Sequence, residues 1–136
     1  MLDKSAALAW CFEDEQTPAV MGLLDRVAET GATAPLLWPL EALNGLLVAE
    51  RRRRLDSTKR SALIGFLRDL PITLDRDTAE QAWDAALRLA ERFRLSVHDA
   101  AYLELAQRRR LPLASLDGDL RQAAVALGVE ALGISP

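Results

Sequence analysis

The segment LPLASLDGDL, residues 111–120, runs from a short apolar stretch into an acidic turn. An apolar run of this length that stops at an Asp-Gly pair is typical of a buried β-strand. The residues from Asp117 to Leu127 are predicted to form a helix, and Gly128 follows its end. The segment therefore predicts a strand over 111–116 that leads directly into a helix.

The same order of strand and helix recurs along the rest of the chain. Further strands are predicted at Leu2 and over 34–38, 71–74 and 129–134. Helices are predicted from Thr17-Pro18 to Gly31, over 58–70, over 78–94 behind an Asp77–Glu80 capping box, and over 100–109. Strands separated by helices favour a parallel sheet covered on both faces. The predicted fold class is α/β, a three-layer α/β/α sandwich with a central parallel sheet, as a single domain over 1–136.

Composition restricts the class of protein. Half of the 136 residues are apolar, 27% are charged and the net charge is −3, which fits a globular domain without a general attraction for nucleic acid. The longest apolar run, 6–12, is too short to span a bilayer, and the first ten residues lack the features of a secretory signal. The single cysteine, Cys11, cannot form an intramolecular disulfide, so we expect a cytoplasmic protein.

Acidic residues follow the predicted strands or open the predicted helices at Asp3, Glu41, Asp99 and Asp117, with Asp119 close behind. Ligands of open parallel sheets bind beyond the carboxyl ends of the strands, so these acids are candidates for one site. Each also has a purely structural interpretation, because helix starts favour acids as caps and as partners of the helix dipole. Asp99 is predicted to be both a cap, paired with Ser96, and a ligand.

Carboxylates that converge in one cleft repel each other, and a divalent cation removes that repulsion. Mg²⁺ and Mn²⁺ prefer oxygen ligands, whereas zinc sites are usually built from His and Cys. The only histidine, His98, adjoins Asp99 and is expected to have a positioning role rather than a catalytic one. The acids therefore predict a Mg²⁺ or Mn²⁺ site, whose usual chemistry is performed on phosphate esters.

Four motifs resemble those of the PIN-domain ribonucleases, and specifically the VapC-type toxins of bacterial type II toxin–antitoxin systems. Asp3-Lys4-Ser5 resembles the family's opening D-x-S, although only two residues precede it where the family normally has a fuller first strand. WPLEALN (38–44) resembles the second motif with Glu41 and Asn44, and HDAAYLELA (98–106) the third around Asp99. LPLASLDGDL resembles the fourth around Asp117, with Ser115 where Thr is more common.

The resemblance implies a homodimeric nuclease that cleaves structured RNA such as tRNA or rRNA by Mg²⁺- or Mn²⁺-activated water. It implies that Asp3, Glu41, Asp99 and Asp117 are catalytic and hold the metal, and that Ser5, Asn44, Ser115 and Asp119 support them. It also implies a VapB-type antitoxin as partner. The alternative is a catalytically inactive PIN-fold module that acts through dimerisation and partner binding.

The remaining charged and aromatic features have structural interpretations. The run ERRRRL (50–55) and the arginines 108–110 are predicted to be solvated helix ends. Trp10, Trp38 and Trp83 are predicted to lie in the core or in a dimer interface rather than to stack on bases. A phosphoacceptor receiver domain is set aside, because Asp3 lacks a neighbouring acid and no lysine follows Lys59.

Overall fold

Helices and short strands alternate along the chain in the computed structural model, which describes residues 1–134. In chain order the elements are α1 (Lys4–Ala9), η1 (Glu13–Glu15), α2 (Pro18–Thr30), β1 (Ala32–Pro35), α3 (Trp38–Arg51), α4 (Ser57–Asp69), β2 (Ile72–Asp75), α5 (Thr78–Gln81), η2 (Ala82–Ala86), α6 (Leu87–Phe93), α7 (Val97–Arg109), β3 (Leu113–Ala114), α8 (Gly118–Ala126) and β4 (Ala131–Leu132).

The strands are parallel, and the first residues of the chain join them. β1 pairs with β2, and β3 pairs with β4. The Leu2 amide donates to the Thr33 carbonyl of β1 at 2.9 Å, and the Asp3 amide donates to the Ala114 carbonyl of β3 at 3.0 Å. The amide of Ala114 in turn donates to the Met1 carbonyl at 2.8 Å. The predicted first strand is therefore short but central, and it places Asp3 at its carboxyl end.

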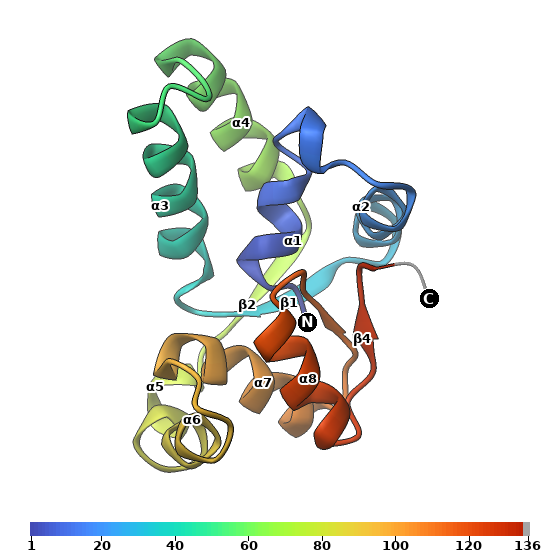
Figure 1. Ribbon diagram of the computed structural model, residues 1–136, viewed down its shortest axis with the longest axis vertical. Helices are drawn as coiled ribbons and strands as arrows, with labels where there is room; N and C mark the ends of the chain where they lie inside the picture. Colours follow the sequence, from blue (N-terminus) through green and yellow to red (C-terminus); the bar gives the residue numbers. More distant parts are fainter. Residues whose placement is uncertain (135–136) are drawn as a thin grey trace.

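Helices cover the strands from both sides. Figure 1 shows α1, α2, α3 and α4 on one side of the strands and α5, α6, α7 and α8 on the other. This arrangement is the three-layer α/β/α sandwich with a parallel middle layer that the sequence predicts. α7 is the most deeply buried helix, since every residue from Ala100 to Ala106 is buried. Its small alanines allow the helix to pack closely against the strands, and this fixes the position of Asp99 at its start.

Several predicted strands are shorter than expected or displaced. The strand predicted over 34–38 is β1, Ala32–Pro35, because Trp38 and Pro39 begin α3 instead. A proline at the first helical positions lacks an N–H that would be unpaired there in any case, so it suits a helix start. The strands predicted over 111–116 and 129–134 shorten to β3 and β4, two residues each.

The helix predicted over 78–94 is divided by a π-helical segment. α5 and α6 flank η2, in which the backbone takes the wider π-helical turn. The prediction of a capping box at Asp77 is wrong. Asp77 has φ −94° and ψ 3°, and within the described residues its side chain accepts no capping hydrogen bond. The Thr78 hydroxyl bonds to the Asp75 carbonyl at 3.1 Å instead.

The three tryptophans do not share one environment. Trp10 and Trp38 are buried, as predicted, but Trp83 is 86% exposed on η2, so it is not a core residue, and its other predicted place, a dimer interface, stays a prediction. Cys11 is buried and burial raises the pKa of its thiol to about 11, which agrees with a role as a small core residue. Within residues 1–134, the helices are all too short or too polar to cross a bilayer.

Candidate active site

Asp3 is the most deeply buried of the four predicted acids. Its Oδ2 atom accepts hydrogen bonds from the Ser5 hydroxyl at 2.7 Å and from the Ser115 hydroxyl at 2.8 Å. Its Oδ1 atom is buried and has no hydrogen-bond partner within residues 1–134. Burial raises the pKa of this carboxyl, and the two serine hydroxyls oppose that rise. One carboxylate oxygen is therefore fixed in place, while the other can accept a cation.

Glu41 and Asp99 share the ammonium group of Lys4, the residue that follows Asp3 in the chain. The Lys4 Nζ atom is 2.7 Å from Glu41 Oε2 and 3.5 Å from Asp99 Oδ1. Burial lowers the pKa of Lys4, but the hydrogen bond to Glu41 and the charges of Asp3, Glu41 and Asp99 raise it overall. Lys4 is therefore charged at neutral pH. Glu41 Oε1 is buried and lacks a hydrogen-bond partner in the described part of the chain.

Glu41 and Asp99 are each placed by the first turn of a helix. Glu41 lies in the first turn of α3, and Asp99 in the first turn of α7. The Ser96 hydroxyl accepts from the Asp99 amide at 3.1 Å, so Ser96 caps α7. The carboxylate of Asp99 faces Lys4 rather than turning back to the helix end. The prediction that Asp99 is itself a cap is therefore wrong, and the capping box is only half formed.

Asp117 is connected to Asp3 through Ser115. The Asp117 amide donates to the Ser115 hydroxyl at 3.1 Å, and that hydroxyl donates to Asp3. The Asp117 carboxylate caps α8, where Oδ1 accepts from the Asp119 and Leu120 amides at 3.0 and 3.3 Å. Asp117 therefore has the structural role of a helix cap, and this role uses one of its two carboxylate oxygens. Asp119 is exposed in the first turn of the same helix.

An open cavity of about 470 Å³ lies against Glu41 and Asp99, and Lys4, Asn44 and His98 are also part of its lining. Asn44 is one helical turn beyond Glu41, so both side chains lie on the same face of α3. His98 precedes Asp99 by one residue, which does not by itself place both on one face. The structure nevertheless gives His98 access to the same cavity.

The donor set fits a hard divalent cation, although the side chains are not arranged as a ready-made cage. Two buried carboxylate oxygens, on Asp3 and Glu41, lack hydrogen-bond donors among the described residues. Buried anionic oxygens without a partner are costly, and a cation is the partner that removes the cost. Within residues 1–134, however, no group of three or more His, Cys, Asp or Glu side chains is gathered closely enough to hold a metal. In this structure the Lys4 ammonium is the cation between Glu41 and Asp99.

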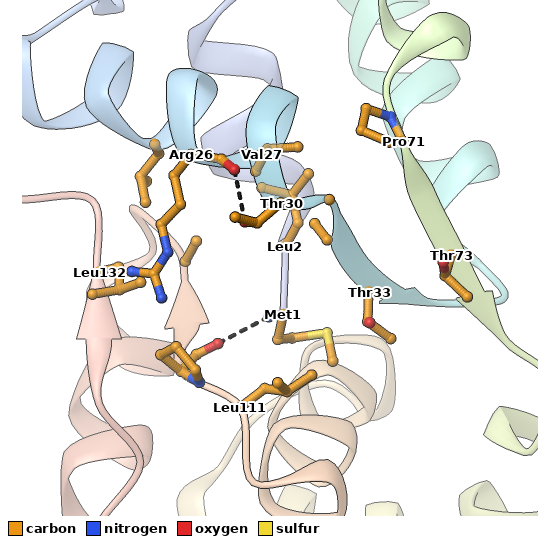
Figure 2. A pocket seen from close by; sticks show the side chains of 15 residues that line it. Met1, Leu2, Arg26, Val27, Thr30, Thr33, Pro71, Thr73, Leu111 and Leu132 are labelled. Atoms are coloured by element: carbon orange, nitrogen blue, oxygen red, sulfur yellow. Dashed lines mark hydrogen bonds between the residues drawn. The ribbon is translucent and has the colours of Figure 1, made fainter.

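A second cavity, of about 330 Å³, lies at the opposite ends of the strands (Figure 2). α2 contributes Arg26, Val27 and Thr30, and the segments that precede β2 and β3 contribute Pro71 and Leu111. Within the described residues its lining contains none of the predicted acids. Because ligands of parallel sheets bind at the carboxyl ends of the strands, the candidate active site is the end that carries Asp3.

Two features of the charged network were not predicted from the sequence. One is Lys4, whose position next to Asp3 in the chain was the available signal. The other is Arg108, predicted to be a solvated helix end. This prediction is wrong, because Arg108 donates to buried Asp75 at 2.7 Å and to Glu104 at 2.6 Å. The spacing of Glu104 and Arg108, four residues apart on one helix, could have revealed the second contact.

Comparisons with known proteins gave a match to a family and a match to a solved structure. Residues 1–126 match a family model described as "PIN domain". A solved structure described as PAE2754 from Pyrobaculum aerophilum superposes with a TM-score of 0.69 at 22% identity, over 96% of this chain and 81% of that chain. At this identity the likeness concerns the fold alone. No curated protein matches the chain.

Proposed function

Because the chain belongs to the PIN-domain family, whose members are generally nucleases, we propose that it is a metal-dependent endoribonuclease and the toxin of a VapBC-type pair. The observation that carries the proposal is the buried Asp3 carboxylate, with one oxygen held by two serines and the other without a donor in residues 1–134. A carboxylate with only a structural role is expected to have its hydrogen bonds satisfied.

The proposed metal ligands are Asp3, Glu41 and Asp99, with Asp117 contributing the carboxylate oxygen that does not cap α8. All four offer oxygen, which favours Mg²⁺ or Mn²⁺. Such a cation, when bound, supplies positive charge that stabilises a pentavalent phosphorane-like transition state and lowers the pKa of an attacking water. Ser5 and Ser115 fix the orientation of Asp3, and Asn44 and His98 line the cavity where a nucleotide would lie.

The proposed reaction is hydrolysis of an RNA phosphodiester that leaves a 5′-phosphate and a 3′-hydroxyl. Structured RNA, such as tRNA or rRNA, is the proposed substrate class on the strength of the VapC-like motifs. A metal-phosphate site does not read base identity, so selectivity must come from the surrounding surface. The proposed partners are a VapB-type antitoxin and a second copy of the chain in the cytoplasm. Leu40, which is exposed beside Glu41, offers apolar surface for such a partner.

The test is cleavage of labelled tRNA and rRNA by the purified chain with Mg²⁺, with Mn²⁺ and with a chelator. We expect discrete fragments that require the metal, and at least about tenfold less cleavage by Asp99→Asn, which removes one anionic ligand. Asp69→Asn, at an exposed acid at the end of α4, is the matched control and should cleave normally. A folded chain that cuts none of these RNAs would favour the alternative, an inactive PIN-fold module that acts by binding.

A groove that includes two residues of the candidate site is the proposed binding path of the RNA backbone. It has a volume of about 460 Å³, and its lining includes Ser5, Asp117, Arg52 and Arg54. The run of arginines was predicted to be a solvated helix end, and Arg52 is indeed exposed just after α3. Arg54 is occupied by ion pairs with Asp14 and Glu15, so Arg52 is the better phosphate contact.

Arg52→Ala is expected to weaken RNA binding severalfold at low salt, because one phosphate contact and its counterion release are lost. Filter binding of catalytically disabled Asp99→Asn, with and without the additional change, measures the effect over a range of salt concentrations. Arg51→Ala is the control, because Arg51 is exposed but is not among the residues that line the groove. Equal losses from both arginines would mean that the groove has no special part in binding.

A further inference from the structure

Lys4 occupies an unusual position for a lysine. It is the first residue of α1, where the partial positive charge of the helix N-terminus disfavours a cation. Its side chain is only 31% exposed. Its ammonium group also lies 6.0 Å from the centre of the buried Tyr102 ring. The ring contact is favourable, whereas the helix N-terminus and the partial burial of the ammonium are not. A lysine with no role in this cleft would extend into solvent, so its contacts with the acids offset the unfavourable terms.

The contacts of Lys4 are with the residues proposed to hold the metal. Its Nζ atom is 2.7 Å from Glu41 Oε2 and 3.5 Å from Asp99 Oδ1, while its backbone is adjacent to Asp3. An ammonium ion and a divalent cation satisfy the same carboxylates, but they cannot occupy the same space between two of them. The positive charge of Lys4, held at Glu41 Oε2 and near Asp99 Oδ1, would therefore oppose the binding of a divalent cation by the same two carboxylates.

We propose that Lys4 is a built-in counterion that competes with the divalent cation for Glu41 and Asp99. This inference rests on the proposed function, because it assumes that these acids bind a metal. Without the metal, Lys4 neutralises the acids and stabilises the cleft. When the metal binds, the ammonium gives up Glu41 and moves into the open cavity that it already lines. The apparent metal affinity is then lower than the bare carboxylates would provide, since part of the binding free energy is used to break the ion pair.

A purely structural tether makes a different prediction. If Lys4 keeps Glu41 and Asp99 while the metal binds to Asp3 and Asp117 alone, removing its charge leaves metal affinity unchanged or weakens it through loss of order. Competition requires the opposite sign, because a neutral side chain leaves the carboxylates free. The direction of the change in metal affinity therefore separates the two roles.

The experiment is calorimetric titration of Mn²⁺ into the full chain at neutral pH and low salt, without RNA. We expect Lys4→Met and Lys4→Gln to bind Mn²⁺ about tenfold more tightly than the original chain, which is the size of one charge-assisted hydrogen bond. Lys4→Arg, which keeps the charge, should bind as weakly as the original. Lys59→Met changes the only other lysine of the chain, an exposed one on α4, and should have no effect.

Thermal unfolding provides a readout that does not depend on RNA cleavage. In chelator, Lys4→Met should unfold at a lower temperature than the original chain, because its acids repel each other. Saturating Mn²⁺ should raise its Tm by more than it raises that of the original. Mn²⁺ affinity that is equal or weaker in both neutral variants overturns the competition but leaves the nuclease proposal standing. No Mn²⁺ binding by any of the folded proteins overturns both.

Discussion

Asp3→Asn is expected to abolish RNA cleavage and at the same time to stabilise the metal-free protein. Asparagine has nearly the shape of aspartate, and its carbonyl oxygen can still accept from Ser5 and Ser115. It cannot provide an anionic oxygen, so we expect cleavage to fall by at least about a hundredfold. The assay is single-turnover cleavage of labelled RNA at saturating Mg²⁺.

The gain in stability follows from the direction of the Asp3 pKa. Burial raises the pKa of Asp3 in the folded chain, so the folded state holds this proton more tightly than the unfolded state does. The stability associated with neutral Asp3 is therefore present below its unfolded pKa, about 4, and is lost as pH rises through the folded value. At neutral pH the ionised group is destabilising, and asparagine removes that charge.

Thermal unfolding in chelator at neutral pH tests this part of the prediction. Asp3→Asn should have a higher Tm than the original chain, whereas the exposed Asp69→Asn should leave both Tm and cleavage unchanged. An Asp3→Asn protein that cleaves RNA normally would remove Asp3 from the site. A variant that loses both activity and stability would instead identify Asp3 as part of the folding core.

Arg108→Met is expected to cause the largest loss of stability. Asp75 has a fully buried side chain, and Arg108 donates to both of its oxygens, at 3.2 and 2.7 Å. Arg108 also pairs with Glu104, which is buried as well. Removal of the guanidinium leaves two buried carboxylates with less compensation. Because Arg108 is 25% exposed and Arg109 keeps a contact with Asp75, we expect a loss of about 2–3 kcal/mol, below the full range for buried pairs.

Urea unfolding measured against pH checks the origin of this loss. The hydrogen bonds and charge of Arg108 lower the pKa of Asp75 in the folded state, although burial opposes the effect. The stabilisation is therefore fully present above the unfolded pKa of Asp75, about 4, and is lost as pH falls through the lower folded value. The difference between the original chain and Arg108→Met should be large at neutral pH and should shrink below about pH 4.

Arg88→Met is the matched control for this experiment. Arg88 forms an ion pair with Asp84, also four residues apart, but both side chains are exposed. Its replacement should change the free energy of unfolding by less than about 0.5 kcal/mol. Similar losses from the two variants would show that burial of Asp75 does not decide the energy of the Arg108 network.

The order of the elements could be predicted because its signals are local. Thr17 and Pro18 begin α2 and Gly31 ends it, where its φ of 77° is a conformation that glycine adopts without strain. Strand limits were less accurate. A strand of two residues, such as β3 or β4, extends only as far as its hydrogen bonds to the neighbouring strand. The apolar run in the sequence is longer and does not show where those hydrogen bonds end.

The acids of the candidate site could be identified from their places after strands and at helix starts, together with the four motifs. The environment of each acid could not be predicted from the sequence. Asp75, which was not singled out from the sequence, is the last residue of β2, yet it is held in an ion pair with Arg108 at the other end of α7 from Asp99. The position of an acid at the end of a strand therefore does not separate candidate metal ligands from structural ion pairs, and only the partners of each carboxylate distinguish them.

Local signals in the sequence are enough to predict the α/β class, the succession of helices and strands, and the acids of the candidate site. Periodicity, turn residues and motif spacing suffice for this, because they act between residues that are close in the chain. Three contacts could be known only from the folded chain: Ser115 donates to Asp3, Lys4 lies between Glu41 and Asp99, and Arg108 pairs with Asp75. Hydrogen bonds and ion pairs depend on distances of a few ångströms between side chains, and for residues as far apart in the chain as Asp3 and Ser115 only packing sets those distances.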